Sequence, residues 1–399
     1  MSEKKKIHLG LISRIIIAII LGIIVGKYLP AGLIRVAVTF SSIFGNFLSF
    51  VIPLMIIAFV TKGIADLGEG AGKLLLITVA IAYISTFIAG SLSYLMAHSV
   101  YPHFLTDDMA KNIQSAQGNE LATYFEVPIT PFFDVTGAIV FAFMLGLAIS
   151  WMRKKGKGEY IYGVISEFNE IITKVLSVAI VPLLPLFIFG NFANMSYSGS
   201  VFAVLSVFWR IFICIIALHL IYVTIMFLIS ASYTKKNPVE LIKNQVRGYM
   251  TAVGTQSSAA TIPVNIECAQ KDGVSKGIRE FVVPLCATVH MPGSMITITS
   301  CAYTVLLMYG LPHGYGIIAP FILTLGVAMV AAPGAPGGAI MSALPFLPMI
   351  GIGTESSMAT LMISLYLTQD SFGTAANVSG DNAISVAMDK IYSKYILKK

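Results

Sequence analysis

The sequence IIAPFILTLGVAMVAAPGAPGGAIMSALPFL, residues 317–347, is an apolar segment that is interrupted at its centre by the run PGAPGG. A second apolar segment, GYMTAVGTQSSAATIPVNI at 248–266, is interrupted by small hydroxyl residues and by Pro263. Non-helical backbone is tolerated at membrane depth only where it is buried in protein or lines a wet cavity. Two such segments in corresponding positions of two halves point to the binding site of a transporter, unless both are ordinary kinked helices.

The composition of the whole chain is typical of a membrane protein. Of its 399 residues, 56% are hydrophobic and only 11% are charged, whereas soluble domains carry roughly 25% charged residues. Apolar runs long enough to span a bilayer recur, and the alternating pattern of a β-barrel is absent. The net charge is +7, but the basic residues lie between apolar spans, which does not favour a nucleic-acid-binding face. We therefore predict an all-α polytopic membrane protein.

The positions of lysine and arginine predict the topology. Spans are expected at roughly 11–29, 38–62, 74–98, 136–152, 168–192 and 200–230, and a last helix at about 352–388. Basic residues are concentrated before the first span and after the second, fourth and sixth, which places both termini in the cytoplasm of a bacterial-type plasma (inner) membrane. Lys271, Lys276 and Arg279 follow the first interrupted segment, whereas the connection 309–316 before the second is uncharged. The pattern predicts eight transmembrane helices plus two oppositely oriented re-entrant helical hairpins, which form an inverted repeat.

Four polar residues of the last helix are predicted to share one face. Asp370, Thr374, Asn377 and Asp381 are spaced i, i+4, i+7 and i+11, which gives a stripe about 60° wide on a helix. Such a stripe can be a structural seam against a neighbouring helix, but charged groups inside a membrane are expensive and usually functional. Oxygen ligands of these types suit a hard cation such as Na⁺, and a carboxylate also suits the ammonium group of an amino acid.

Four motifs are spread along the second half of the chain: QSSAATIPV (256–264), HMPGS (290–294), AAPGAPGGAI (331–340) and DSFGTAANVSGD (370–381). Together they resemble the dicarboxylate/amino acid:cation symporter family, the glutamate-transporter homologues, and within it the sodium:serine/threonine symporter subgroup. The resemblance implies a homotrimer that works as an elevator-type transporter. It implies scaffold helices in 1–73 and 132–198, a transport-domain helix in 74–98, an extracellular loop in 99–131 and the transport-domain core in 199–399.

The resemblance also implies a substrate site. Asp370 would bind the ammonium group of the substrate, Asn377 its α-carboxylate, and Thr374 would lie beside them. Further substrate-binding positions would lie on the tip of the first hairpin, around the HMPGS motif, on the lid formed by the second hairpin and on the last helix: Ser257, Ser258, Met291, Ser294, Ala335, Gly337, Ala339 and Gly373.

Sodium sites are implied in the same way. Asp381 with the backbone carbonyls of Cys286, His290 and Asn377 resembles one Na⁺ site. A second site, which depends on the lid, would use carbonyls of four residues: Thr288, Met329, Val330 and Ala332. Ser85 and Thr86 resemble the remnant of a third site. The family's NMDGT motif reads HMPGS here, so Pro292 replaces the aspartate of that third site, and we expect two sodium ions or fewer and no organic cofactor.

Departures from the family pattern bear on the substrate. Gly373 stands where members that transport acidic amino acids have an arginine, and Gln256 replaces a second arginine known in some members. A second carboxylate of a substrate would therefore be buried without a partner, which costs several kcal/mol. We expect small neutral L-amino acids such as serine, threonine or alanine.

His290 leaves two interpretations open. A histidine in a membrane helix can relay protons, or it can be a neutral residue that is hydrogen-bonded within the bundle. The alternative functions are a proton-coupled amino-acid or dicarboxylate symporter of the same fold and, in a different class, an ion channel. No nucleophile–base pair or phosphate loop indicates an enzyme.

Overall fold

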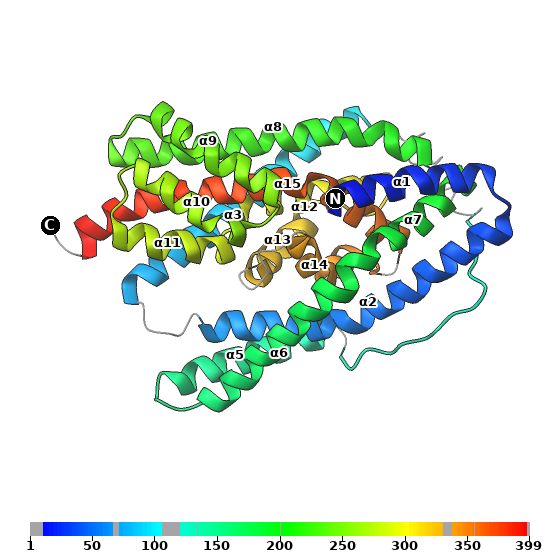
Figure 1. The fold of residues 1–399 in the computed structure, drawn as a ribbon, viewed down its shortest axis with the longest axis horizontal. Helices are drawn as coiled ribbons and strands as arrows, with labels where there is room; N and C mark the ends of the chain where they lie inside the picture. Colours follow the sequence, from blue (N-terminus) through cyan, green and yellow to red (C-terminus); the bar gives the residue numbers. More distant parts are fainter. Residues whose placement is uncertain are drawn as a thin grey trace, which may run out of the picture.

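The computed structural model describes residues 11–66, 72–105, 120–133, 135–199, 201–329, 337–354 and 356–396. Within these ranges the regular structure is helical and no strand occurs. Figure 1 shows an elongated bundle in which long helices such as α2, α8 and α15 run along the longest axis. The prediction of an all-α fold is confirmed for this part of the chain.

The first group of helices is built mainly from the first half of the chain. It contains α1 (Leu11–Tyr28), α2 (Ala31–Asp66), α5 (Val135–Arg153), α6 (Glu159–Val175), the π-helical turn η2 (Leu176–Ile180) and α7 (Val181–Ser198). Helix α1 packs along α7, and α2 packs along α5, α6 and α7. The α1–α7 contact is close because Gly22 and Gly26 lack side chains, and a Cβ at either position would overlap α7.

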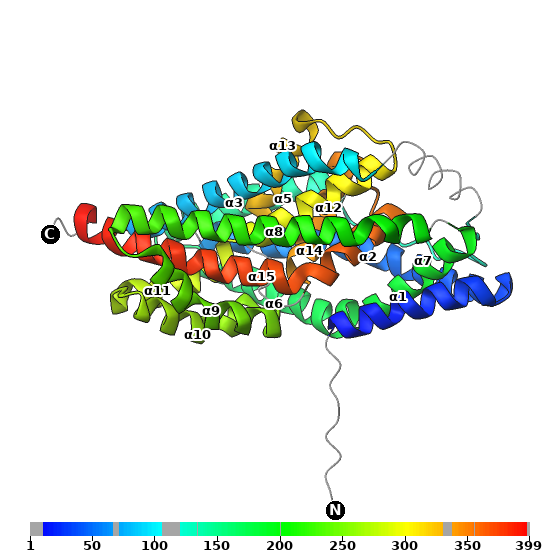
Figure 2. The same cartoon turned by 90° about the horizontal axis from the view of Figure 1, so that it is seen from above.

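The second group surrounds α15 (Ser357–Ile391). Its helices are α3 (Gly72–Val100), α8 (Val201–Thr234), α9 (Pro238–Thr255), α10 (Ser258–Lys271), α11 (Lys276–Val289), α12 (Pro292–Met308), α13 (Tyr315–Met329) and α14 (Gly338–Ala343). Short segments extend them: η1 (Tyr101–His103), η3 (Leu344–Ile350) and η4 (Tyr392–Ile396). Helix α15 packs against α8 through α12, and Figure 2 shows it between α8 and the α9–α11 group. Most of its side chains are buried, so it forms the axis of this group.

Both apolar segments that looked interrupted in the sequence are interrupted in the structure. Helices α9 and α10 pack against each other and are separated by Gln256 and Ser257, of which Gln256 has a left-handed φ of 53°. Helix α13 ends at Met329 and α14 begins at Gly338, and residues 330–336 lie outside the described ranges. We refer to α9–α10 as the first hairpin and to α13–α14 with η3 as the second hairpin.

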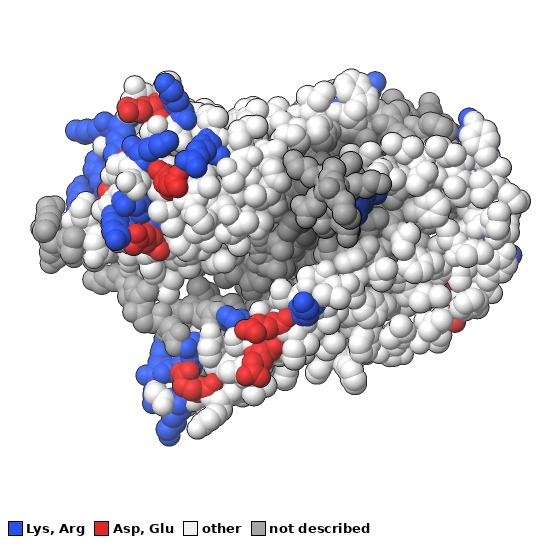
Figure 3. All heavy atoms as spheres, viewed as in Figure 1, with Lys and Arg blue, Asp and Glu red and all other residues white. Residues whose placement is uncertain are grey.

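Several helices have the length and composition of membrane spans. Five stretches in the described part of the chain qualify: Ala31–Lys62, Leu74–His103, Glu159–Ser198, Phe208–Thr234 and Lys276–Met308. On the face shown in Figure 3, lysine and arginine side chains gather at one end of the molecule, over α9–α11 and near the α5–α6 turn, and the opposite end carries few. This distribution supports a multi-pass membrane protein. The count of eight spans and the entry of both hairpins into the membrane remain predictions.

The helix boundaries differ from the sequence-based ones at a few ends. The span expected at 168–192 is the middle of a longer helical stretch, Glu159–Ser198. Its first part, α6, is amphipathic, so a search for uniformly apolar runs misses it. The last helix begins at Ser357 and not near 352, because Ser356 caps it by accepting a hydrogen bond from the backbone N–H of Ala359.

Candidate substrate and ion site

The polar stripe of α15 is buried along its whole length. Asp370, Thr374, Asn377 and Asp381 are each at most 5% exposed. The stripe faces the start of α12, where the helical run of α11 breaks at His290 and Met291 before Pro292 begins the next helix. A broken helix leaves backbone groups free to bind side chains or ligands, and here the N–H groups of Gly293 and Ser294 bind the side-chain amide of Asn377 on α15.

Asp370 has two neutral hydrogen-bond donors. Its Oδ2 accepts from the backbone N–H of Gly337, at the start of α14, at 2.7 Å. Its Oδ1 accepts from the hydroxyl of Tyr366 at 2.8 Å, and the same hydroxyl lies 3.1 Å from Ser294 Oγ. Tyr366 was not among the residues expected from the sequence, although its position one turn before Asp370 places it on the same helix face.

Asn377 binds the N-terminus of α12. Its Oδ1 accepts hydrogen bonds from the backbone N–H groups of Gly293 at 2.8 Å and Ser294 at 3.2 Å, and its Nδ2 donates to Ser294 Oγ at 3.0 Å. The structure therefore connects four of the predicted substrate-binding residues through one network: Gly337, Asp370, Ser294 and Asn377, with Tyr366 between the second and the third.

Helices α12 and α15 touch backbone to backbone beside this network. A Cβ at Gly293 would overlap the carbonyl oxygen of Gly373, so only glycine fits at 293. The face of Gly373 is filled by Thr297, whose Oγ1 would lie 3.4 Å from a Cβ at 373. Behind it, the buried His219 of α8 places Nε2 at 2.9 Å from Gly293 O and 3.1 Å from Thr297 Oγ1. Among the described residues, no lysine or arginine is hydrogen-bonded to Asp370 or Asn377.

Asp381 and His290 form a second buried centre. Nδ1 of His290 lies 2.9 Å from Asp381 Oδ1, and its Nε2 lies 2.9 Å from Ser85 Oγ on α3. Asp381 Oδ2 is buried and has no hydrogen-bond partner in the part of the chain that the structure describes. A carboxylate oxygen without a donor is the type of ligand that a hard cation takes. The backbone carbonyl of Cys286, another predicted ligand of this ion site, accepts the N–H of His290 at 2.9 Å.

The other predicted ion ligands are less clearly assembled. Thr86 Oγ1 donates to the carbonyl of Ala82 within its own helix, and Thr288 is exposed. Met329 is buried at the end of α13. Val330, Ala332 and Ala335 lie outside the described residues, so the lid-dependent sodium site stays a prediction.

The remaining residues that are expected to bind substrate lie at the starts of helices. Ser257 is the N-cap of α10 and accepts from the N–H of Ala260 at 3.1 Å, while Ser258 is buried beside it. Met291 and Ala339 are buried at the starts of α12 and α14. Their contact with substrate remains a prediction.

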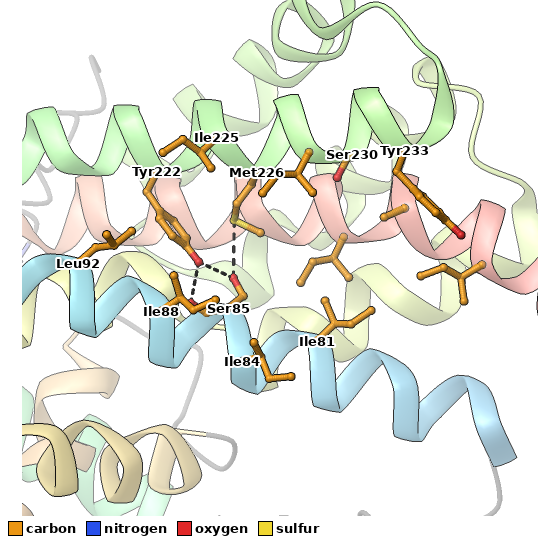
Figure 4. A pocket seen from close by; sticks show the side chains of 14 residues that line it. Ile81, Ile84, Ser85, Ile88, Leu92, Tyr222, Ile225, Met226, Ser230 and Tyr233 are labelled. Carbon is orange, nitrogen blue, oxygen red and sulfur yellow. Dashed lines mark hydrogen bonds between the residues drawn. The ribbon is translucent and has the colours of Figure 1, made fainter.

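A groove of about 570 Å³ reaches the outer side of the His290 centre. It lies between α3, α8 and α15 and is lined almost entirely by apolar side chains (Figure 4). In its wall, the hydroxyl of Tyr222 donates to the carbonyl of Ser85 at 2.6 Å and lies 2.9 Å from Ser85 Oγ, while Met226 lies near Gly380 beside the imidazole ring. Ser85 therefore connects the wall of the groove to His290.

A bundle of apolar helices around one helix with buried carboxylates is the architecture of a multi-pass transport protein. Residues 11–391 match the sequence model of the sodium:dicarboxylate symporter family. The chain belongs to this family, whose members are transporters and not enzymes, and it is accordingly a membrane symporter.

Individual relatives agree with this family assignment. The serine/threonine transporter SstT of Acinetobacter baylyi is 25% identical, over 96% of this chain and 98% of the relative. The SstT of Acinetobacter baumannii strain AYE is 27% identical, over 96% of this chain and 97% of the relative. Excitatory amino acid transporter 1 of Ambystoma tigrinum is 28% identical, over 62% of this chain and 46% of the relative.

Proposed function

We propose that the chain is a Na⁺-coupled symporter of small neutral L-amino acids, with serine, threonine and alanine as its substrates. The observation that carries the proposal is the environment of Asp370: its carboxylate is buried with neutral donors, and Gly373 offers no cation to a second carboxylate of a substrate. The α-ammonium group of a substrate supplies the positive partner that the carboxylate of Asp370 lacks, whereas succinate or aspartate brings an additional negative charge. Similarity to serine/threonine transporters over nearly the full length supports this substrate class.

The proposed mechanism uses the two groups of helices. In this proposal, 1–73 and 132–198 form a trimeric scaffold, and 74–98 with 199–399 forms the transport domain that carries the site across the inner membrane as an elevator. The proposal includes eight spans, two re-entrant hairpins and cytoplasmic termini, in line with the basic end of the molecule.

Counterflow into proteoliposomes tests the substrate class. Vesicles loaded with unlabelled L-serine should accumulate labelled L-serine, and L-threonine and L-alanine should compete while succinate should not. The transport of each of the three neutral amino acids should require Na⁺. Competition by succinate or L-aspartate, with no effect of the three neutral amino acids, would refute the proposal.

Sodium coupling is proposed to act through Asp381, whose Oδ2 has no hydrogen-bond partner among the described residues. The substitution Asp381→Asn removes the negative charge from the ion site. The Na⁺ concentration for half-maximal serine binding should therefore rise about tenfold or more. Asp389→Asn is the matched control, because Asp389 also lies on α15 but binds Ser275 at an exposed position. Serine binding that ignores Na⁺ and follows pH would instead favour the proton-coupled alternative.

A further inference from the structure

Tyr366 is a fully buried polar residue at the centre of the substrate network. It is 0% exposed, it lies one turn before Asp370 on α15, and its hydroxyl is the donor to Asp370 Oδ1 at 2.8 Å. The hydroxyl also lies 3.1 Å from Ser294 Oγ, which in turn accepts from Asn377 Nδ2 at 3.0 Å. One phenol group therefore connects the residue proposed to bind the ammonium group with the residue proposed to bind the α-carboxylate.

The chemistry of the phenol decides what charge the pocket presents. A buried carboxylate without donors is strongly disfavoured, and a lysine or arginine partner would neutralise it and reduce its attraction for a ligand cation. A phenol hydroxyl satisfies Oδ1 without adding charge. The phenol therefore does not cancel the charge of an ionised Asp370, and Oδ2, which accepts from the N–H of Gly337, is the oxygen at the boundary with the second hairpin.

We propose that Tyr366 is a positioning residue that determines substrate selectivity. Its neutral hydrogen bond fixes the rotamer of Asp370 and leaves Oδ2 to an α-ammonium group, so the site selects zwitterionic amino acids and rejects carboxylates that lack an amino group. The proposal rests on the proposed function, because it specifies how that site recognises the amino group.

The test is L-serine binding to the purified full-length protein in saturating Na⁺. Tyr366→Phe removes one oxygen and keeps the ring, and it should weaken serine binding about tenfold or more, as expected for a buried hydrogen bond to a charged group. In an Asp370→Asn background, the same substitution should have little further effect, because Tyr366 acts through that carboxylate. A purely structural role would not produce this coupling.

Tyr303→Phe is the matched control. Tyr303 is also fully buried, and its hydroxyl lies 3.1 Å from Nδ1 of His98, away from the α15 network. This variant should bind L-serine as the wild type does. If Tyr366→Phe gives no folded protein, Tyr366 is required for folding itself, and its assignment as a positioning residue for serine is overturned.

Two further results overturn the assignment of Tyr366. One is wild-type serine affinity in Tyr366→Phe; the other is an equal loss on substituting Tyr366 with and without Asp370. A wild-type protein that binds no L-serine is a different result, because it refutes the proposed function before any variant is compared.

Discussion

The two hairpins are held to α15 by different forces. The first hairpin is attached by a buried amide network: Asn265 Nδ2 donates to Val378 O at 2.9 Å, Gln245 Nε2 donates to Asn265 Oδ1 at 3.0 Å, and Asn382 Nδ2 donates to Gln245 Oε1 at 2.8 Å. In the described part of the second hairpin, the hydrogen bond to α15 is the one from Gly337 to Asp370, and the rest of α14 and η3 packs through buried apolar side chains.

This difference indicates which hairpin can move without breaking the bundle. A buried amide network has a fixed geometry, and each group left without a partner costs about 1–3 kcal/mol. Apolar contacts are non-directional, so a segment that depends on them can shift at lower cost. The attachment of the second hairpin passes through the carboxylate proposed to bind substrate, so we expect its closure to respond to substrate, whereas the first hairpin stays fixed.

The largest effect is expected where the second hairpin meets α15. Asp370→Asn removes the charge that faces the ammonium group, and the loss of a buried charge partner costs about 3–5 kcal/mol, so serine binding should fall by at least a hundredfold. Binding assays on purified protein measure this, with size-exclusion chromatography to show that assembly is retained. Near-normal affinity in a well-folded variant would make the stripe a structural seam.

A smaller effect, on stability and not on affinity, is expected from the first hairpin. Asn265→Ala removes the buried acceptor of Gln245 Nε2 and the side-chain donor to the carbonyl of Val378, which should destabilise the protein by about 1–3 kcal/mol and lower its thermal unfolding midpoint. Thr251→Ala on the same hairpin is the control, since its hydroxyl is exposed and bonded within α9. An unchanged midpoint in Asn265→Ala would contradict the rigid attachment.

The smallest effect is expected at the start of α14. Gly337 has φ +75°, and a Cβ there would lie 3.1 Å from Leu367 Cδ2, so Gly337→Ala should strain the contact of the second hairpin with α15 by about 1 kcal/mol, which the protein without substrate can relieve by shifting the hairpin. Serine affinity should fall several-fold while the unfolding midpoint changes little. Gly353→Ala, at a position with φ below zero where a Cβ would make only an ordinary contact of 3.9 Å with Ser356 Cβ, should change neither. A loss of stability equal to that of Asn265→Ala would remove the distinction between the hairpins.

Helical periodicity predicted the main features of the site because they depend on one helix. The spacing of Asp370, Asn377 and Asp381 placed them on one face, and the structure buries all three. The non-helical positions at Gly337 and Gln256 were also readable, since glycine, proline and small hydroxyl residues disfavour a continuous helix.

The missed features depend on how separate helices meet. Tyr366 looks like an ordinary aromatic core residue until α12 places Ser294 beside it. His219 likewise meets the carbonyl of Gly293 only because α8 packs beside the start of α12. Such distances between helices are set by packing and not by the period of any one sequence segment. For the same reason, the two bonds of His290, to Asp381 and to Ser85, could not be read from the chain.

The two buried carboxylates of α15 also have an electrical consequence. In the described part of the chain, neither Asp370 nor Asp381 accepts a hydrogen bond from a lysine or arginine. When ionised, they give the site two negative charges, and a membrane potential acts on each charge carried through it with about 2.3 kcal/mol per 100 mV. Zwitterionic serine adds no net charge, so one sodium ion leaves one net negative charge on the loaded site and two sodium ions cancel both. The voltage dependence of serine uptake therefore counts the ions that travel with it.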